Sequence, residues 1–130
     1  MMDRTRERQP DSILLVDDEE PIRKLMRVIL EPKGFRILEA ASSDQALGIL
    51  EVHGVRIQLV VTDIQMPPGM DGVDLVESVR RRRPDLPVVF ISGYSHQYGR
   101  LSTVIDQERT WFLQKPFSPY QLFEAVKLAI

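Results

Sequence analysis

The sequence lacks cysteine, which excludes disulfide bonds and thiol chemistry and removes any argument for an oxidising compartment. It also lacks an apolar run near the roughly 18 residues that a membrane-spanning helix needs. Residues 1–8 are charged and contain no apolar stretch of the kind found in signal peptides. From these absences we expect a cytoplasmic protein with no membrane partner.

A strong excess of charge of either sign is missing as well. Lysine and arginine total 17 against 19 aspartates and glutamates, a net charge of −2, so no direct nucleic-acid partner is expected. The contents of 43% hydrophobic and 28% charged residues are ordinary for a globular protein. With 130 residues the chain is long enough for one hydrophobic core and too short for two. We expect a flexible arm over residues 1–11 and one domain over residues 12–130.

Short apolar runs alternate with segments of helical periodicity along this domain. The runs predicted to form buried strands are residues 13–16, 35–39, 57–62, 88–91 and 111–113. Apolar residues at helical spacing, mostly preceded by capping residues, predict helices beginning near residues 20, 42, 71, 96 and 118. The last of these is expected to bury Leu122, Val126 and Leu128. Five strands alternating with five helices predict an α/β fold, with a parallel sheet covered on both faces.

Polar residues stand where the predicted strands end. They are Asp17, Asp18 and Glu19 after the first strand, Asp63 after the third, Ser92 after the fourth and Lys115 after the fifth. In open parallel sheets, ligands bind outside the carboxyl ends of the strands, at the point where the strand order reverses. We therefore expect these side chains to converge on one cavity.

The chemistry of such a cavity follows from its carboxylates. Neighbouring carboxylates repel each other and raise each other's pKa unless a cation compensates them. Mg²⁺ suits the site, because it takes one or two carboxylates together with water and phosphate oxygens. With the metal bound, one carboxylate can attack phosphorus while a lysine and a hydroxyl stabilise the phosphoryl oxygens. We predict that Asp63 is this nucleophile, Lys115 the cation and Ser92 the hydroxyl donor.

Each residue also has an ordinary structural explanation. Acidic residues at positions 17–20 would stabilise the following helix through its dipole whatever their function. Asp63 and Ser92 would serve equally well as turn residues. The arginine run at residues 80–83 is either a phosphate-binding patch or a solvated helix end, and the helix dipole favours the second interpretation. The functional hypothesis depends on several residues reaching one edge of one sheet.

Five segments match a known pattern. They are Leu-Val-Asp-Asp-Glu (15–19), Val-Thr-Asp-Ile-Gln-Met-Pro (61–67), Met-Asp-Gly (70–72), Ser-Gly-Tyr (92–94) and Phe-Leu-Gln-Lys-Pro-Phe (112–117). In this order the chain resembles the receiver domain of bacterial two-component response regulators, and in particular the receivers attached to hybrid sensor histidine kinases. The resemblance implies a flavodoxin-like, doubly wound five-stranded sheet with strand order 2-1-3-4-5 and five helices.

The resemblance also implies a reaction. Asp63 would accept a phosphoryl group from the phosphohistidine of a sensor kinase or phosphotransfer protein. Mg²⁺ would be bound by Asp18, Asp63 and the backbone carbonyl of Gln65, while Asp17 would act mainly through a bound water. Lys115 would pair with the phosphoryl oxygens. Such a domain is not an enzyme in the usual sense, since it catalyses only its own phosphorylation and dephosphorylation.

In this family the signal is passed on by a change of surface. Ser92 and Phe112 would move inward as switch residues, and the face made by the fourth helix, fifth strand and fifth helix would then change. That face would control a downstream protein or an output domain. The sequence departs from the common pattern at Phe112, which is often tyrosine, and in the loop over residues 66–72, which is one residue longer.

Two other functions compete with this one. Phosphatases with an aspartate nucleophile carry a second aspartate two positions later, where this chain has Gln65, a residue that cannot act as a general acid or base. A receiver fold that signals without phosphorylation usually lacks one of the acids or the lysine, and all are present here. The sequence leaves open whether the domain stands alone or belongs to a longer protein.

Overall fold

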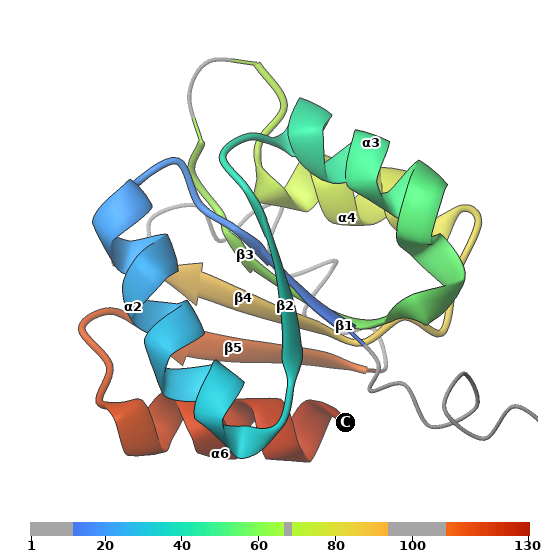
Figure 1. Ribbon diagram of the computed structural model, residues 1–130. Coiled ribbons are helices and arrows are strands. Elements are labelled where there is room, and N and C mark those ends of the chain that lie inside the picture. The colour runs from blue at the N-terminus through green and yellow to red at the C-terminus, as the bar shows by residue number, and fades with distance from the viewer. Residues whose placement is uncertain (1–11, 67–68, 94–108) are drawn as a thin grey trace, which may run out of the picture.

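A computed structural model of the chain describes residues 12–66, 69–93 and 109–130. The expected arm (1–11) and the helix expected over residues 96–106 lie outside these residues. The described residues form a five-stranded parallel sheet with strand order β2-β1-β3-β4-β5, flanked by helices (Figure 1). The α/β class and the strand order are therefore confirmed.

The strands coincide closely with the apolar runs of the sequence. They are β1 (Ser12–Val16), β2 (Arg36–Ala40), β3 (Ile57–Asp63), β4 (Val88–Ser92) and β5 (Thr110–Gln114). Every residue of β1 and β4 is buried, because both faces of these inner strands are covered. By contrast, β5 lies at the edge of the sheet and its residues are half-buried or exposed.

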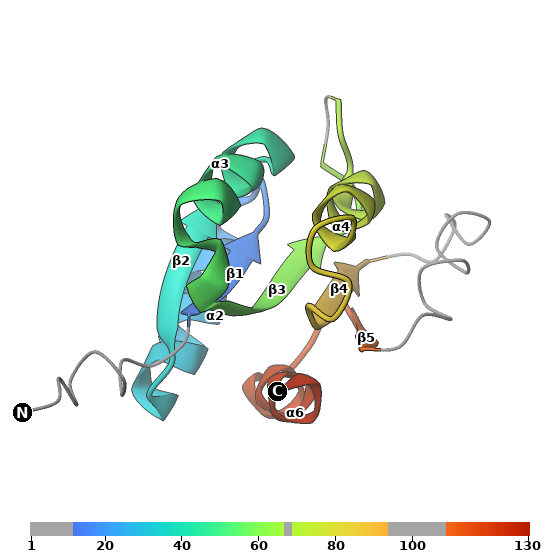
Figure 2. The same ribbon diagram turned by 90° about the vertical axis from the view of Figure 1, so that its right-hand side faces the viewer.

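Four α-helices lie within the described residues. They are α2 (Glu20–Leu30), α3 (Ser43–His53), α4 (Gly72–Arg80) and α6 (Pro119–Ala129), and short 3-10 turns follow two of them, η1 (Glu31–Lys33) and η2 (Gly54–Arg56). The pair α2 and α6 covers one face of the sheet, and the pair α3 and α4 covers the other (Figures 1 and 2). No helix of this described part is both long and apolar enough to cross a membrane.

The two faces of the sheet carry two separate halves of the core. On β1, Ile13 and Leu15 belong to the half under α2 and α6, whereas Leu14 and Val16 belong to the half under α3 and α4. This alternation is the ordinary two-residue period of a strand. A strand buried on both faces must be apolar at every position, which explains the uninterrupted runs in the sequence.

Capping residues define where two of the helices begin. Asp71 and Asp74 form a reciprocal capping box at the start of α4, and Ser118 and Gln121 form another at the start of α6. The buried face of α6 differs from the prediction. Leu122, Val126 and Ala129 are buried, while Leu128 is 68% exposed. The residue three positions after Val126 is Ala129, and it is this residue that lies on the buried side of α6. The prediction for Leu128 was therefore wrong.

Candidate functional site

The sheet brings the polar strand ends together. Val16 of β1 pairs with Thr62 of β3. Asp17 and Asp63, which come next on the two chains, therefore lie side by side at the carboxyl edge of these adjacent strands. On the other side, Ser92 of β4 pairs with Gln114 of β5, and Lys115 comes next along the chain. Because the strands are parallel and in register, side chains far apart in sequence share one edge.

Three carboxylates and one ammonium group meet there. Oxygens of Asp17, Asp18 and Asp63 all lie within 4.8 Å of one another. Lys115 Nζ lies 2.9 Å from Asp63 Oδ2 and 3.6 Å from Asp17 Oδ2. Asp17 is fully buried and Asp63 is 8% exposed, whereas Asp18 is exposed. The cluster is thus an acidic pocket that is open to solvent at Asp18.

The electrostatics of this pocket show a deficit of positive charge. Burial raises the pKa of Asp17 to about 6, and the charges of Asp63 and Glu19 add to the effect, while the Glu19 amide and Lys115 oppose it. Burial tends to lower the pKa of Lys115, but the hydrogen bond to Asp63 and the charge of Asp17 raise it above its ordinary value. Among the described residues, Asp17 Oδ2 is buried without a hydrogen-bond donor.

An oxygen-lined pocket of this kind fits a hard divalent cation. The aspartate cluster supplies the carboxylate oxygens that Mg²⁺ prefers. Asp17 Oδ2 supports this fit: it is buried, lies 3.6 Å from the Lys115 ammonium group and accepts no hydrogen bond among the described residues, which is costly for a carboxylate oxygen. Gln65, expected to contribute its carbonyl, donates its backbone amide to Asp63 Oδ1 at 3.1 Å.

The two expected switch residues lie on β4 and β5. Ser92 is 5% exposed, and its backbone carbonyl accepts a hydrogen bond from the Lys115 amide at 2.8 Å. Phe112 pairs with Phe90 of β4 in the sheet but is 36% exposed, so its ring is at the surface in this structure. The switching roles of both residues stay predictions.

The loop before α4 contacts the residue that follows β3 and the start of α3. The amide of Gly72 donates to the Ile64 carbonyl at 2.8 Å. Ser43, at the start of α3, donates its hydroxyl to the Met70 carbonyl at 3.1 Å. These contacts hold the segment from residue 70 to residue 72 between the start of α3 and the residue that follows β3.

Two further residues border the pocket: Glu19 was among the strand-end residues expected at this edge, whereas Arg23 was not singled out by the sequence pattern. Glu19 Oε1 lies 3.4 Å from Lys115 Nζ, so this exposed glutamate shares the lysine with the aspartates. Arg23 donates to the Asp17 backbone carbonyl at 2.6 Å. The available signal was the position of Arg23 in the first turn of a helix that starts beside Asp17, which aims its side chain back toward the strand end.

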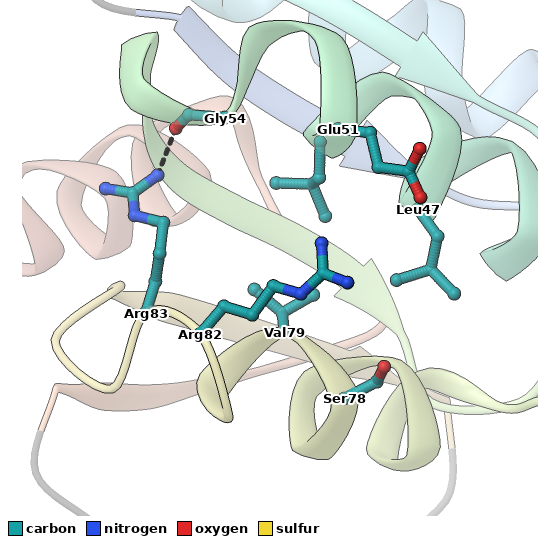
Figure 3. Close-up of a pocket in the computed structure, with 8 residues that line it drawn as sticks. Leu47, Glu51, Gly54, Ser78, Val79, Arg82 and Arg83 are labelled. Atoms are coloured by element: carbon teal, nitrogen blue, oxygen red, sulfur yellow. Dashed lines mark hydrogen bonds between the residues drawn. The ribbon is translucent and has the colours of Figure 1, made fainter.

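The arginine run is largely structural. Arg80 donates to Thr110 Oγ1 at 2.7 Å and to the Arg109 carbonyl at 2.8 Å. Arg83 donates to the carbonyls of Ile57, at 2.6 Å, and Gly54. Figure 3 shows the bond from Arg83 to the Gly54 carbonyl. In the same view Arg82 extends along a cavity of about 220 Å³ between α3 and α4. The predicted solvated helix end therefore holds for the exposed pair at positions 81 and 82 and is wrong for Arg80 and Arg83.

Comparisons with known proteins agree with this arrangement. The family model described as the response regulator receiver domain matches residues 13–127. The chain is 38% identical over 116 residues to the sensor kinase CckA of Brucella abortus, covering 89% of this chain and 12% of that protein. It is 36% identical over 121 residues to a putative NtrX-like response regulator of Rickettsia bellii, covering 90% of this chain and 24% of that protein. The chain thus spans a quarter or less of these relatives.

Solved structures show the same fold. The receiver domain of NtrX from Brucella abortus superposes with a TM-score of 0.81 at 32% identity, covering 91% of this chain and 97% of that one. A CheY-like receiver domain protein from Methanospirillum hungatei gives a TM-score of 0.80 at 27% identity, with 92% of both chains covered. The strand order, the acidic pocket and these matches lead to one conclusion. The chain belongs to the response regulator receiver domain family of two-component signalling systems.

Proposed function

We propose that this domain accepts a phosphoryl group on Asp63 in a Mg²⁺-dependent reaction, with the phosphohistidine of a sensor kinase or phosphotransfer protein as donor. The proposal is carried by one observation. Lys115 Nζ lies 2.9 Å from Asp63 Oδ2, in a pocket where the oxygens of Asp17 and Asp18 come within 4.8 Å of those of Asp63. Nucleophile, cation and metal-binding carboxylates therefore occupy one site.

Each residue of the site has a defined part in the reaction. A bond forms between an Asp63 carboxylate oxygen and phosphorus, and the bond from phosphorus to the imidazole nitrogen breaks, with its electron pair leaving on the nitrogen. Lys115 transfers its hydrogen bond from Asp63 to a phosphoryl oxygen, where negative charge must be neutralised. Asp17, Asp18, Asp63 and the Gln65 carbonyl would hold Mg²⁺, which neutralises charge on the phosphoryl oxygens when bound.

The same site supports a switch. Ser92 ends β4 next to Lys115, so a hydrogen bond from its hydroxyl to the phosphoryl group would pull the end of this strand inward. Phe112 is surface-exposed on the adjacent strand and would move into the space that Ser92 leaves. This change would alter the face around β5 and α6 and thereby control a downstream protein or output domain. We place this signalling in the cytoplasm, and the domain would also catalyse loss of its own phosphoryl group.

The direct test is the intact mass of the protein after incubation with Mg²⁺ and acetyl phosphate. We expect a gain of one phosphoryl group that disappears when the metal is chelated and in Asp63→Asn. The matched control is Asp85→Asn, which removes an exposed carboxylate outside the cluster and should leave the gain unchanged. Histidine-phosphorylated donor proteins should phosphorylate the same residue.

Two outcomes would contradict the proposal. If Asp63→Asn gained the same mass as the wild type, the phosphoacceptor would be a different residue. If neither acetyl phosphate nor phosphohistidine donors added mass to a folded, Mg²⁺-binding protein, the domain would signal without phosphorylation.

A further inference from the structure

Arg23 connects two strand ends beside the acidic cluster. Its Nη1 donates to the backbone carbonyl of Asp17 at 2.6 Å, and its Nε donates to Glu39 Oε1 at 2.9 Å. Asp17 directly follows β1, and Glu39 lies near the end of the neighbouring strand β2. The Arg23 side chain is only 11% exposed. One guanidinium group therefore ties the loop that carries the metal-binding aspartates to the adjacent strand.

Asp17 is held by two further hydrogen bonds. Its amide donates to the Ala40 carbonyl at 3.1 Å, and its Oδ1 accepts from the Glu19 amide at 2.8 Å. Together with the bond from Arg23, these contacts fix the backbone at Asp17 and so the direction in which the chain continues to Asp18. Such a restraint is needed, because carboxylates held within 4.8 Å of each other repel and an unrestrained loop would relax outward.

The other end of the Arg23 link is itself firmly held. The Glu39 side chain is 10% exposed and also accepts hydrogen bonds from Lys24, at 3.2 Å, and from Arg27. Burial tends to raise the pKa of Glu39, but the hydrogen bonds from Arg27, Arg23 and Lys24 outweigh it and lower the pKa below its ordinary value. Glu39 thus stays ionised and forms a charged anchor for the guanidinium group of Arg23.

We propose that Arg23 is a positioning residue of the Mg²⁺ site, which places Asp17 and Asp18 before the metal binds. The inference rests on the proposed function for the identity of the metal. The role requires a guanidinium group, since Nε and Nη1 serve two acceptors at once in a fixed planar geometry. A lysine ammonium at this position has one nitrogen and cannot hold both acceptors in the same arrangement.

The direction of the effect separates positioning from simple electrostatics. Removing a cation near three carboxylates would by itself strengthen Mg²⁺ binding, because it removes a repulsion. Loss of a positioning contact weakens binding instead, and residues that orient metal ligands are typically worth about 10-fold or more in affinity. We therefore expect Arg23→Gln to raise the Mg²⁺ dissociation constant of the full chain by about 10-fold, measured by titration calorimetry.

Arg27→Gln is the matched control. It makes the same change of charge and removes a hydrogen bond to the same Glu39, but the bonds of Arg27 go to Glu39, Glu31 and the Ile37 carbonyl. Its Mg²⁺ affinity should stay within about twofold of the wild type, since no metal ligand loses a contact. Arg23→Lys, which keeps the charge, should bind Mg²⁺ nearly as weakly as Arg23→Gln.

A second readout needs no metal. The Glu19 amide donates to Asp17 Oδ1, so its hydrogen exchange reports directly on the restraint of the loop. Exchange at Glu19 in the metal-free protein should be faster in Arg23→Gln than in Arg27→Gln, while urea unfolding shows that both variants are folded. Equal Mg²⁺ affinities of these two variants, or tighter binding by Arg23→Gln, would overturn the inference alone. Failure of the wild type to bind Mg²⁺ would overturn both this inference and the proposed function.

Discussion

The backbone of Gly72 lies directly against the carbonyl group of Asp63. A Cβ atom at this position would overlap the Asp63 carbonyl oxygen and would come within 3.0 Å of its carbonyl carbon. Both atoms of the carbonyl belong to the backbone of β3 at Asp63, so neither can move without moving the site. The glycine is therefore required by close packing rather than by backbone conformation.

We expect Gly72→Ala to destabilise the domain by about 1–3 kcal/mol through overpacking against rigid backbone. Phosphorylation of Asp63 should slow as well, because the carboxylate is displaced from Lys115. Urea unfolding and the rate of mass gain measure the two effects. Gly48→Ala is the control, since a Cβ at this exposed position in α3 meets nothing within 4 Å and should stabilise the helix by roughly 0.5–1 kcal/mol. Equal effects of the two substitutions would contradict the packing argument.

Asp17→Asn should stabilise the metal-free protein at neutral pH. The folded-state pKa of Asp17 is about 6, above its ordinary value of 3.8, so ionisation of this carboxyl favours the unfolded chain. Its contribution to stability is complete below the ordinary pKa and is lost as the pH rises through about 6. The asparagine variant should therefore be more stable than the wild type by about 1–3 kcal/mol at pH 8.

This advantage should shrink as the pH falls from about 6 toward 3.8. Urea denaturation at several pH values in the presence of a chelator measures it, with exposed Asp85→Asn as the control for a general loss of negative charge. Mg²⁺ should reverse the order by stabilising the wild type more than Asp17→Asn. A difference between Asp17→Asn and wild type that did not vary with pH would show that burial of the charged carboxylate is not its cause.

Lys115→Ala should separate phosphorylation from the conformational change. The alanine variant lacks the ammonium group that contacts Asp63 and Asp17, so phosphoryl transfer should slow by about 100-fold but still reach the same final mass. Trp111 lies half-buried on β5, four residues before Lys115, and its fluorescence should change on phosphorylation in the wild type only. Lys127→Ala, which removes an exposed lysine from α6, should behave as the wild type in both measurements. A full fluorescence response in Lys115→Ala would argue against the role of this lysine.

Arg80→Gln should lower stability without affecting phosphorylation. Arg80 ties the end of α4 to the beginning of the edge strand through Thr110 Oγ1 and the Arg109 carbonyl. Losing these hydrogen bonds, of which the one to Thr110 is partly buried, should cost about 1–3 kcal/mol in urea unfolding. Exposed Arg82→Gln should change stability by no more than about 0.5 kcal/mol. If Arg82→Gln instead slowed phosphorylation by a phosphoprotein donor, the arginine run would serve in recognition.

The sequence alone predicted the α/β class and the strand-end residues that the sheet brings together. An uninterrupted apolar run marks a strand buried on both faces, and the polar residues that follow it mark the strand end. Asp17, Asp63 and Lys115 were located in this way, because a parallel sheet places all carboxyl ends at one edge. The capping residues Asp71 and Ser118 could also be predicted from the sequence, since a helix cap involves residues within four positions of each other.

Contacts between distant segments were decided only by the tertiary structure. Helical periodicity did not distinguish Leu128 from Ala129, because which of them is buried depends on how α6 lies on the sheet. Charge patterning predicted that Arg80 is solvated, because its acceptor Thr110 lies 30 residues further along the chain and is brought to it only by folding. The raised pKa of Asp17 likewise reflects burial by neighbouring strands, and the link from Arg23 to Glu39 joins a helix to a strand 16 residues away. Local sequence patterns predict helices, strands and the turns between them. Burial and long-range hydrogen bonds depend on how these elements pack, which the local sequence does not specify.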